Sequence, residues 1–127
     1  MIYYENKQYS VSFYTLVLSS VSPVIEFIES LPPKHQAKIF KYIDFLRFKN
    51  GILDEPYSRH IKGKIRELRV DFGKNKYRIF YFTLIGKRIV MLHGFIKKTN
   101  QTPIQEISMA EKNYSNVINN LNHYEKR

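Results

Sequence analysis

Hydrophobic residues in the first half of the chain recur at the spacing of α-helices. An alternating stretch, Val11–Val17, first predicts a strand. Ser22 and Pro23 then suit an N-cap and a first helical position, and the double proline at 32–33 separates two apolar stripes. The stripes contain Val24, Phe27, Ile28 and Leu31, and then Ile39, Phe40, Ile43 and Leu46. Because Asn50-Gly51 tolerates the left-handed conformation that ends many helices, the pattern predicts two consecutive helices forming a hairpin.

The middle of the chain changes to a period of two. Three segments are rich in β-branched and aromatic residues and are joined by short turn-like links: Ile65–Phe72, Tyr77–Thr83 and Arg88–Ile96. They predict an antiparallel meander. Alternation places Leu68, Val70, Ile79 and Tyr81 on one face of this sheet, and Glu67, Arg69 and Arg78 on the opposite face. We expect Arg78 on that second face to support no core packing.

A third helix is predicted from Pro103 onward. Residues 102–105 read as a capping box with proline at the first helical position. Its apolar stripe comprises Ile107, Ala110, Tyr114, Val117, Ile118 and Leu121, and the polar end, residues 122–127, is expected to fray. The elements together predict an α+β fold, with an N-terminal helical hairpin packed on a small antiparallel sheet and a C-terminal helix. A chain of 127 residues, 43% of them hydrophobic, suits a single domain over residues 1–127.

The excess of positive over negative charge is confined to one segment of the chain. Residues 57–98 contain twelve Lys or Arg against two acidic residues, so their net charge is 12 − 2 = +10, while the rest of the chain holds nine of each sign. The charge therefore decorates the predicted sheet and not a tail. Such a surface is typical of proteins that hold phosphates.

Composition and motifs exclude several kinds of site. The chain has no cysteine, which rules out disulfides and thiol chemistry and fits a cytoplasmic protein. It has no phosphate-binding glycine loop, no nucleophile elbow and no paired zinc-binding histidines. The four histidines are scattered, so we expect neither a metal site nor a cofactor, and no stretch suits a membrane span.

One carboxylate and one imidazole, Glu67 and His93, lie in the same three strands as the basic residues. RNA cleavage needs little more, because the RNA's own 2′-hydroxyl attacks the adjacent phosphate. Arginine suits the stabilisation of phosphoryl charge, and Glu67 or His93 could serve as base or acid. The alternative is a solvated face in which Glu67 pairs with Arg69 or Arg78. The aromatic residues interleaved with these charges, such as Phe80 and Phe95, could stack bases, but most should be core.

Three ordered motifs lie between Leu31 and Ala110: KGKIRELR (residues 62–69), YRIFY (77–81) and HGFIKKTNQTP (93–103). In this order and spacing they resemble the HigB-type toxins of the RelE/ParE superfamily, including their phage-encoded relatives. The resemblance implies a RelE-like fold and a cognate antitoxin, often of the helix-turn-helix HigA type, in a toxin–antitoxin hetero-oligomer. RelE-like members cut mRNA on the ribosome without metal, whereas ParE-like members poison DNA gyrase.

The resemblance also assigns residues. Arg69 and Arg78 match basic positions of the nuclease branch, and Glu67 lies in the E-L-R motif. Together with His93, they are the candidate catalytic residues. Candidate RNA contacts are Lys62, Lys64, Arg66, Lys97 and Lys98. The catalytic tyrosine or histidine found near the C-terminus of well-known members has no counterpart, since Tyr114 lies within an apolar stripe. No general acid is therefore assigned.

The sequence is best interpreted as a toxin that cleaves mRNA at the ribosome. One alternative is a ParE-like gyrase inhibitor, or a relative that only binds nucleic acid or its antitoxin. Another is a basic structural domain that binds an acidic partner segment, in which case charge at Lys74 or Lys87 would matter as much as Arg78.

Overall fold

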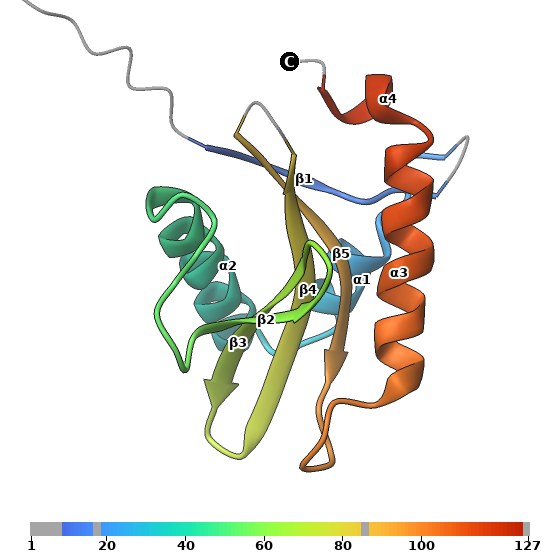
Figure 1. Cartoon of the computed structure of the whole chain (residues 1–127). Helices are drawn as coiled ribbons and strands as arrows, with labels where there is room; N and C mark the ends of the chain where they lie inside the picture. The colour runs from blue at the N-terminus through green and yellow to red at the C-terminus, as the bar shows by residue number, and fades with distance from the viewer. Residues whose placement is uncertain (1–8, 17–18, 85–86, 126–127) are drawn as a thin grey trace, which may run out of the picture.

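The computed structural model describes residues 9–16, 19–84 and 87–125, and consists of a five-stranded sheet with helices on both faces (Figure 1). The elements in chain order are β1 (Ser10–Phe13), α1 (Pro23–Glu29), α2 (Pro33–Phe48), β2 (Ser58–Lys62), β3 (Ile65–Phe72), β4 (Asn75–Leu84), β5 (Arg88–Ile96), α3 (Ile104–Ile118) and α4 (Leu121–Glu125). The predicted α+β fold, with a helical hairpin on a small sheet and a C-terminal helix, is confirmed, and it is consistent with a RelE-like architecture.

The strands lie in the order β1-β5-β4-β3-β2. The meander of β3, β4 and β5 is antiparallel as predicted, and the bounds of β3 and β5 agree with the sequence pattern. The first predicted strand is present as Ser10–Phe13, but it pairs with β5 in parallel; Val17, at the end of the predicted range, lies outside the described residues. The edge strand β2 was not predicted, because its mostly exposed polar residues lack an alternating apolar pattern.

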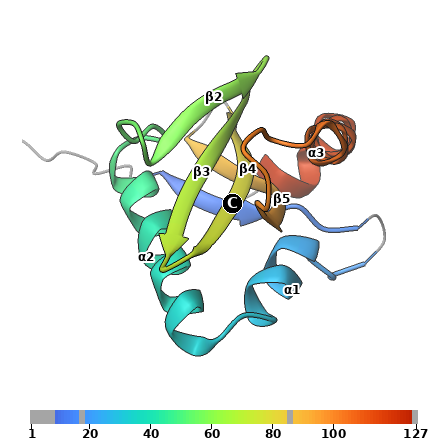
Figure 2. The same cartoon turned by 90° about the horizontal axis from the view of Figure 1, so that it is seen from below.

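Helices α1 and α2 cover one face of the sheet (Figure 2). Ser22 caps α1, since its Oγ accepts a hydrogen bond of 3.2 Å from the backbone N–H of Ile25, as predicted. Both Asn50 (φ 60°) and Gly51 (φ 88°) adopt the left-handed conformation after α2. A Cβ on Gly51 would lie 2.8 Å from Thr83 Oγ1, so glycine also permits close packing at this position.

Helix α3 packs on the other face, where a second core lies against β4 and β5. Its N-cap is Pro103, which makes no side-chain capping bond, so the predicted capping box from Thr102 is wrong. The helix starts at Ile104, too late for the Thr102 hydroxyl to cap it. The predicted fraying is also wrong for residues 122–125: α4 follows α3, and its Tyr124 is buried with its hydroxyl 3.1 Å from the Thr15 backbone N–H.

Candidate functional site

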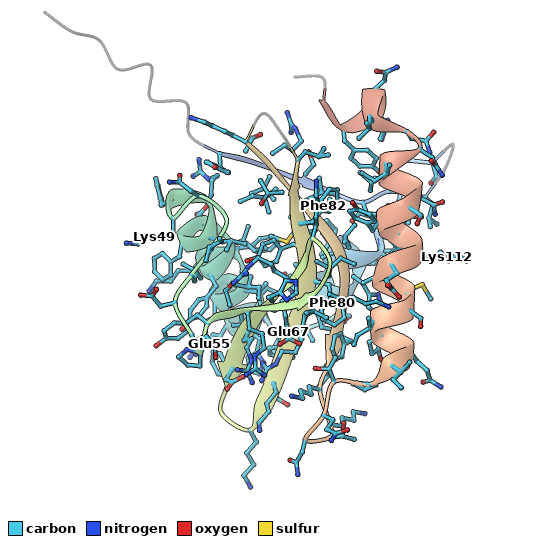
Figure 3. The ribbon with its side chains drawn as sticks, viewed as in Figure 1. Lys49, Glu55, Glu67, Phe80, Phe82 and Lys112 are labelled. Atoms are coloured by element: carbon cyan, nitrogen blue, oxygen red, sulfur yellow. The ribbon has the colours of Figure 1, made fainter. Side chains whose placement is uncertain are left out.

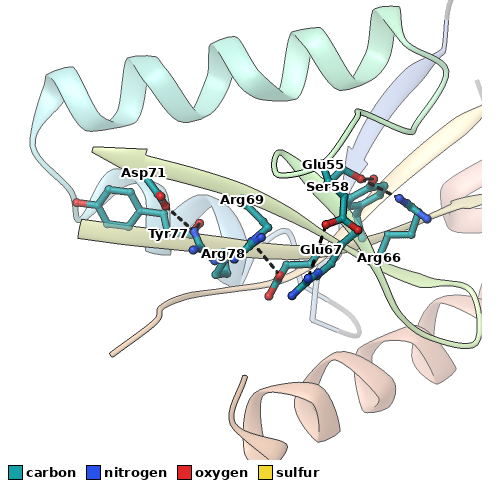
Figure 4. Close-up of polar contacts among 10 residues, drawn as sticks. Glu55, Ser58, Arg66, Glu67, Arg69, Asp71, Tyr77 and Arg78 are labelled. Atoms are coloured by element: carbon teal, nitrogen blue, oxygen red, sulfur yellow. Dashed lines mark hydrogen bonds and ion pairs between the residues drawn. The ribbon is translucent and has the colours of Figure 1, made fainter. Parts of the chain in front are cut away.

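The two faces of β3 and β4 carry the residues that alternation assigned to them. Leu68, Val70, Ile79 and Tyr81 belong to the core beneath α1 and α2. Glu67, Arg69 and Arg78 lie on the opposite face, where Arg69 is directly across from Arg78 and Glu67 is across from Phe80. Figure 4 shows the three charged side chains following one another along the two strands. The face prediction is confirmed for all seven residues.

Glu67 is a buried carboxylate, with 1% of its surface exposed. Its Oε1 lies 3.6 Å from Arg69 Nε, which is an ion-pair distance but too long for a good hydrogen bond. Among the described residues, its Oε2 finds no hydrogen-bond partner, and neither does Arg69 Nε. A buried carboxylate normally has its hydrogen bonds satisfied, because its desolvation is costly. The pairing with Arg69 is therefore real but incomplete, and Glu67 retains the capacity to accept a proton or a hydrogen bond.

Arg78 is also buried, which contradicts the expectation that it supports no core packing. Its side chain is 2% exposed, and its Nη1 donates to Asp71 Oδ1 at 2.8 Å and to the Tyr77 carbonyl at 2.9 Å. The buried ring of Phe95 lies opposite it on β5. The expectation failed because this face of the sheet carries a core of its own: Phe95, directly across from Arg78, belongs to the second core.

We therefore predict that Arg78→Ala lowers the free energy of unfolding by about 2 kcal/mol, because it removes enclosed methylene groups as well as a hydrogen-bonded cation. Urea denaturation of the purified protein measures this loss. Lys76→Ala is the matched control: Lys76 lies two residues away on the same strand but is exposed, so its loss should cost no more than about 0.5 kcal/mol. Equal stability of the two variants would contradict the structural role of Arg78.

Lys97 extends the cluster from the end of β5. Its backbone N–H donates to the Lys76 carbonyl at 2.8 Å. Burial lowers the pKa of the Lys97 ammonium; the Glu67 carboxylate acts in the opposite direction, and the cations of Arg78, Arg69 and Lys76 lower the pKa further. We call Glu67, Arg69, Arg78 and Lys97 the charged cluster. It concentrates positive charge around one partly unpartnered carboxylate.

Two further cations near the charged cluster were missed by sequence reasoning. Arg59 of β2 lies directly across from Glu67, although its guanidinium is 3.7 Å from Glu55. Lys76 of β4 is close enough to influence Lys97. The position of Arg59 could be found only by recognising β2, whereas Lys76 could have been placed by continuing the period of two from Arg78.

The structure does not bring His93 into the charged cluster. Its Nε2 lies 2.5 Å from Glu106 of α3, and Phe80 occupies the row between His93 and Glu67. Phe80 and Phe82, labelled with Glu67 in Figure 3, belong to the core beneath α3. His93 therefore lies at the edge of the α3 interface on β5, separated from Glu67 on β3 by Phe80 of the intervening strand β4.

The remaining candidate RNA contacts are dispersed. Lys62 pairs with Glu111 of α3 at 2.9 Å, and Lys64 and Lys98 are exposed. Arg66 lies on the α2 side of β3, where its Nη2 donates to Ser58 Oγ at 3.2 Å, because residues 66, 68 and 70 share that face. Among the five predicted RNA contacts, the structure places Lys97 in the charged cluster.

The aromatic residues of the meander are mainly core, as predicted. Tyr77, Phe80, Tyr81, Phe82 and Phe95 are all buried. Phe72 is half-buried and stacks on His35, with ring centroids 3.9 Å apart. Tyr114 makes an edge contact with Phe82 at 4.7 Å, consistent with its place in the apolar stripe of α3. None of these rings forms an exposed platform for bases.

A prominent hollow on the described surface lies away from the charged cluster. It has a volume of about 580 Å³ and lies between the segment after β1 and the end of α3, where its walls include Tyr14, Asn116 and Tyr124. In the charged cluster, Arg69 and Lys97 are partly exposed, whereas Glu67 and Arg78 are buried beside them. Within residues 9–16, 19–84 and 87–125, no group of three or more metal-binding side chains occurs, and no helix is long and apolar enough to cross a membrane.

Comparison with known proteins identifies the family. None of the proteins with curated descriptions matches the chain significantly. The family model described as phage-derived protein Gp49-like (DUF891) matches residues 26–115, which include strands β2 to β5 and the whole charged cluster. The match covers more than half of the chain. The chain therefore belongs to the phage-derived Gp49-like family, a toxin-like family within the RelE/HigB-type toxin superfamily.

Proposed function

We propose that this protein is the toxin of a type II toxin–antitoxin pair and that it cleaves mRNA at the ribosome without a metal ion. Membership in a toxin-like family supports the first part. The observation that carries the second is the charged cluster: a buried carboxylate, one oxygen of which has no hydrogen-bond partner within the described part of the chain, lies among two guanidinium groups and a lysine. Phosphoryl transfer within RNA requires a base and cations in this kind of arrangement.

In this mechanism the RNA 2′-oxygen attacks the adjacent phosphorus while Glu67 accepts the 2′-hydroxyl proton. The bond from phosphorus to the 5′-oxygen breaks, leaving a 2′,3′-cyclic phosphate and a 5′-hydroxyl. Arg69 stabilises the charge on the phosphoryl oxygens by direct contact, and the enclosed Arg78 adds its positive charge without contact. Lys97, whose pKa is lowered by burial, is a better proton donor to the leaving oxygen than an ordinary lysine.

Arg69 controls access to Glu67 in this proposal. Arg69 is 21% exposed, whereas Glu67 beside it is 1% exposed. A phosphate that draws the guanidinium outward would uncover the carboxylate as the substrate binds. His93, tied to Glu106, is assigned no step.

The decisive experiment is the mapping of transcript 5′ ends after induction of the protein alone. We expect growth arrest and new 5′ ends within translated codons. Intact mRNA accompanied by gyrase-linked DNA breaks would replace this proposal by the ParE-like alternative. Arrest with neither kind of damage would instead support a toxin that only binds nucleic acid.

We further propose that the partner is a cognate antitoxin of the helix-turn-helix HigA type and that both proteins act in the cytoplasm. A toxin-like family supports an antitoxin partner. Co-expression of the two should restore growth, and the pair should purify as one hetero-oligomer. A neighbouring protein that neither rescues growth nor co-purifies would exclude that protein as the antitoxin.

A pH dependence follows from Lys97. Because its pKa lies below the ordinary value, Lys97 loses its proton at a lower pH than a free lysine, and its contact with an RNA phosphate weakens as the pH rises. The affinity for a fluorescent single-stranded RNA, measured by anisotropy from neutral to alkaline pH, should therefore begin to fall at a lower pH than the deprotonation of ordinary lysines would cause; we call this the early decline. Lys97→Gln should abolish the early decline and reduce the slope of log affinity against log salt by about 0.7.

Lys98→Gln is the comparison, since Lys98 is exposed and adjacent in sequence. It should keep the early decline and change only the salt slope. A wild-type pH profile that Lys97→Gln leaves unaltered would place the RNA away from Lys97.

A further inference from the structure

The outer surface of α2 and the segment after it exposes an unusual concentration of large apolar side chains. Phe48 is 60% exposed, Ile52 58% and Tyr57 46%. A hollow of about 350 Å³ lies among them, lined by Tyr42, Phe45, Phe48, Lys49, Leu53 and Tyr57. We call these six residues the aromatic groove. Contiguous apolar surface of this kind is characteristic of an interaction site.

The aromatic groove is preformed by contacts within the protein. The Tyr42 ring packs against Phe45 at 5.7 Å and against Tyr57 at 5.8 Å. Below it, the buried Tyr81 hydroxyl donates to the Gly51 carbonyl at 2.8 Å and lies 2.8 Å from Ser58 Oγ. These hydrogen bonds fix both ends of the segment that carries Leu53 and Tyr57. A preformed site avoids the cost of ordering its own walls on binding.

A second hollow connects the aromatic groove to the charged cluster. It measures about 230 Å³ and is lined by Lys38, Tyr42, Pro56, Tyr57, Arg69 and Asp71. Tyr42 and Tyr57 line both hollows, and Arg69 belongs to the charged cluster. Arg69 therefore lies at the end of the second hollow, next to Tyr57 at the edge of the aromatic groove.

Charge around the groove indicates the chemistry of the occupant. Helix α2 and its C-cap contain five basic residues and one acidic residue: Lys34, Lys38, Lys41, Arg47 and Lys49, against Asp44. Lys38 and Lys41 lie over the rings of Tyr42 and Phe45. Of the nearby acidic residues, Asp44 faces Arg47 and Glu55 faces Arg59, and Asp54 is exposed. Lys49 and Glu55, labelled in Figure 3, lie on this outer side of the molecule.

We propose that the aromatic groove binds one acidic amphipathic segment of the antitoxin, whose apolar side chains enter the groove and whose carboxylates meet Lys41, Lys49 and, past Tyr57, Arg69. This inference rests on the proposed function. A second copy of this chain is a poor occupant because each copy carries a net charge of +10. Occupation of Arg69 explains how such a segment would inhibit the toxin, since it would remove a phosphate-binding cation from the charged cluster.

The test uses Phe45→Ser/Phe48→Ser in the full chain. Both side chains are largely exposed, and serine and phenylalanine have similar helix propensities, so α2 should persist. Ile104→Ser/Met109→Ser on α3 is the matched control, since its side chains are 80% and 44% exposed and far from the groove. Circular dichroism verifies the fold of each variant. Fluorescent 20-residue peptides tiling the protein encoded beside this chain's gene serve as probes.

We expect the groove variant to arrest growth as the wild type does but to escape rescue by the neighbouring protein, and to bind the active peptide at least about tenfold more weakly. The control variant should be rescued and bind normally. Lys41→Glu/Lys49→Glu, which alters only exposed side chains, should also weaken peptide binding and reduce its salt dependence.

Equal rescue and equal peptide binding of the groove and control variants would overturn the inference. So would a groove variant that loses single-stranded RNA binding while it keeps the peptide, since the groove would then belong to the RNA site. If the wild type itself causes no arrest, the proposed function fails, and peptide binding by the same variants still decides the docking surface.

Discussion

Arg69→Ala should abolish growth arrest and lower the rate of RNA cleavage by about a hundredfold or more, which is the usual cost of losing one group that stabilises transition-state charge. Arg69 is the partly exposed guanidinium of the charged cluster, whereas Arg78 is enclosed and bonded to Asp71. The change removes the ion-pair partner of Glu67 but also opens this carboxylate to water, which compensates for the lost pair, so the fold should survive, as circular dichroism can verify. Single-turnover cleavage of a ribosome-bound mRNA by the purified variant measures the effect.

Lys74→Ala is the control for this prediction. Lys74 is exposed at the turn between β3 and β4 and contributes the same charge to the basic segment. If the basic segment acted only through its total charge, the two variants would lose activity equally. That result would favour the alternative of a basic domain that binds an acidic partner.

Glu67→Gln should separate binding from catalysis. The amide preserves the shape of the side chain but accepts no proton, so we expect cleavage to fall by about 10²- to 10⁴-fold, the range typical of general base catalysis. RNA affinity should be unchanged or higher, because one negative charge is removed beside a bound phosphate. Quenched time-course assays measure the cleavage rate, and anisotropy with the same RNA measures the affinity.

A suitable companion is His93→Gln, which breaks the contact with Glu106 on the far side of Phe80. It should retain most of the cleavage rate if Glu67 is the base. Full activity in Glu67→Gln together with a severe loss in His93→Gln would assign the role of base to the His93 imidazole. In that case the contact between His93 and Glu106 of α3 would have to break before the RNA binds.

The sequence determined those features that depend on neighbours along the chain. The period of two in residues 65–72 and 88–96 predicts β3 and β5 because alternate side chains point to opposite faces. The same alternation assigned Glu67 to the face opposite α1 and α2. Ser22 and Asn50-Gly51 marked helix ends because capping and left-handed backbone are properties of single residues.

The tertiary structure alone decided which of these residues are enclosed and which meet. The parallel pairing of β1 with β5 joins residues 78 apart, such as Ser10 and Arg88, and the bond between Thr15 and Tyr124 spans 109 residues, so no local pattern records them. Arg78 is buried beside Phe95, a residue of the second core, and the pairing of β2 with β3 placed Arg59 opposite Glu67. Residue type fixes the chemistry of a side chain, but its burial and its partners depend on elements distant in sequence. Both the charged cluster and the aromatic groove are built by such distant elements.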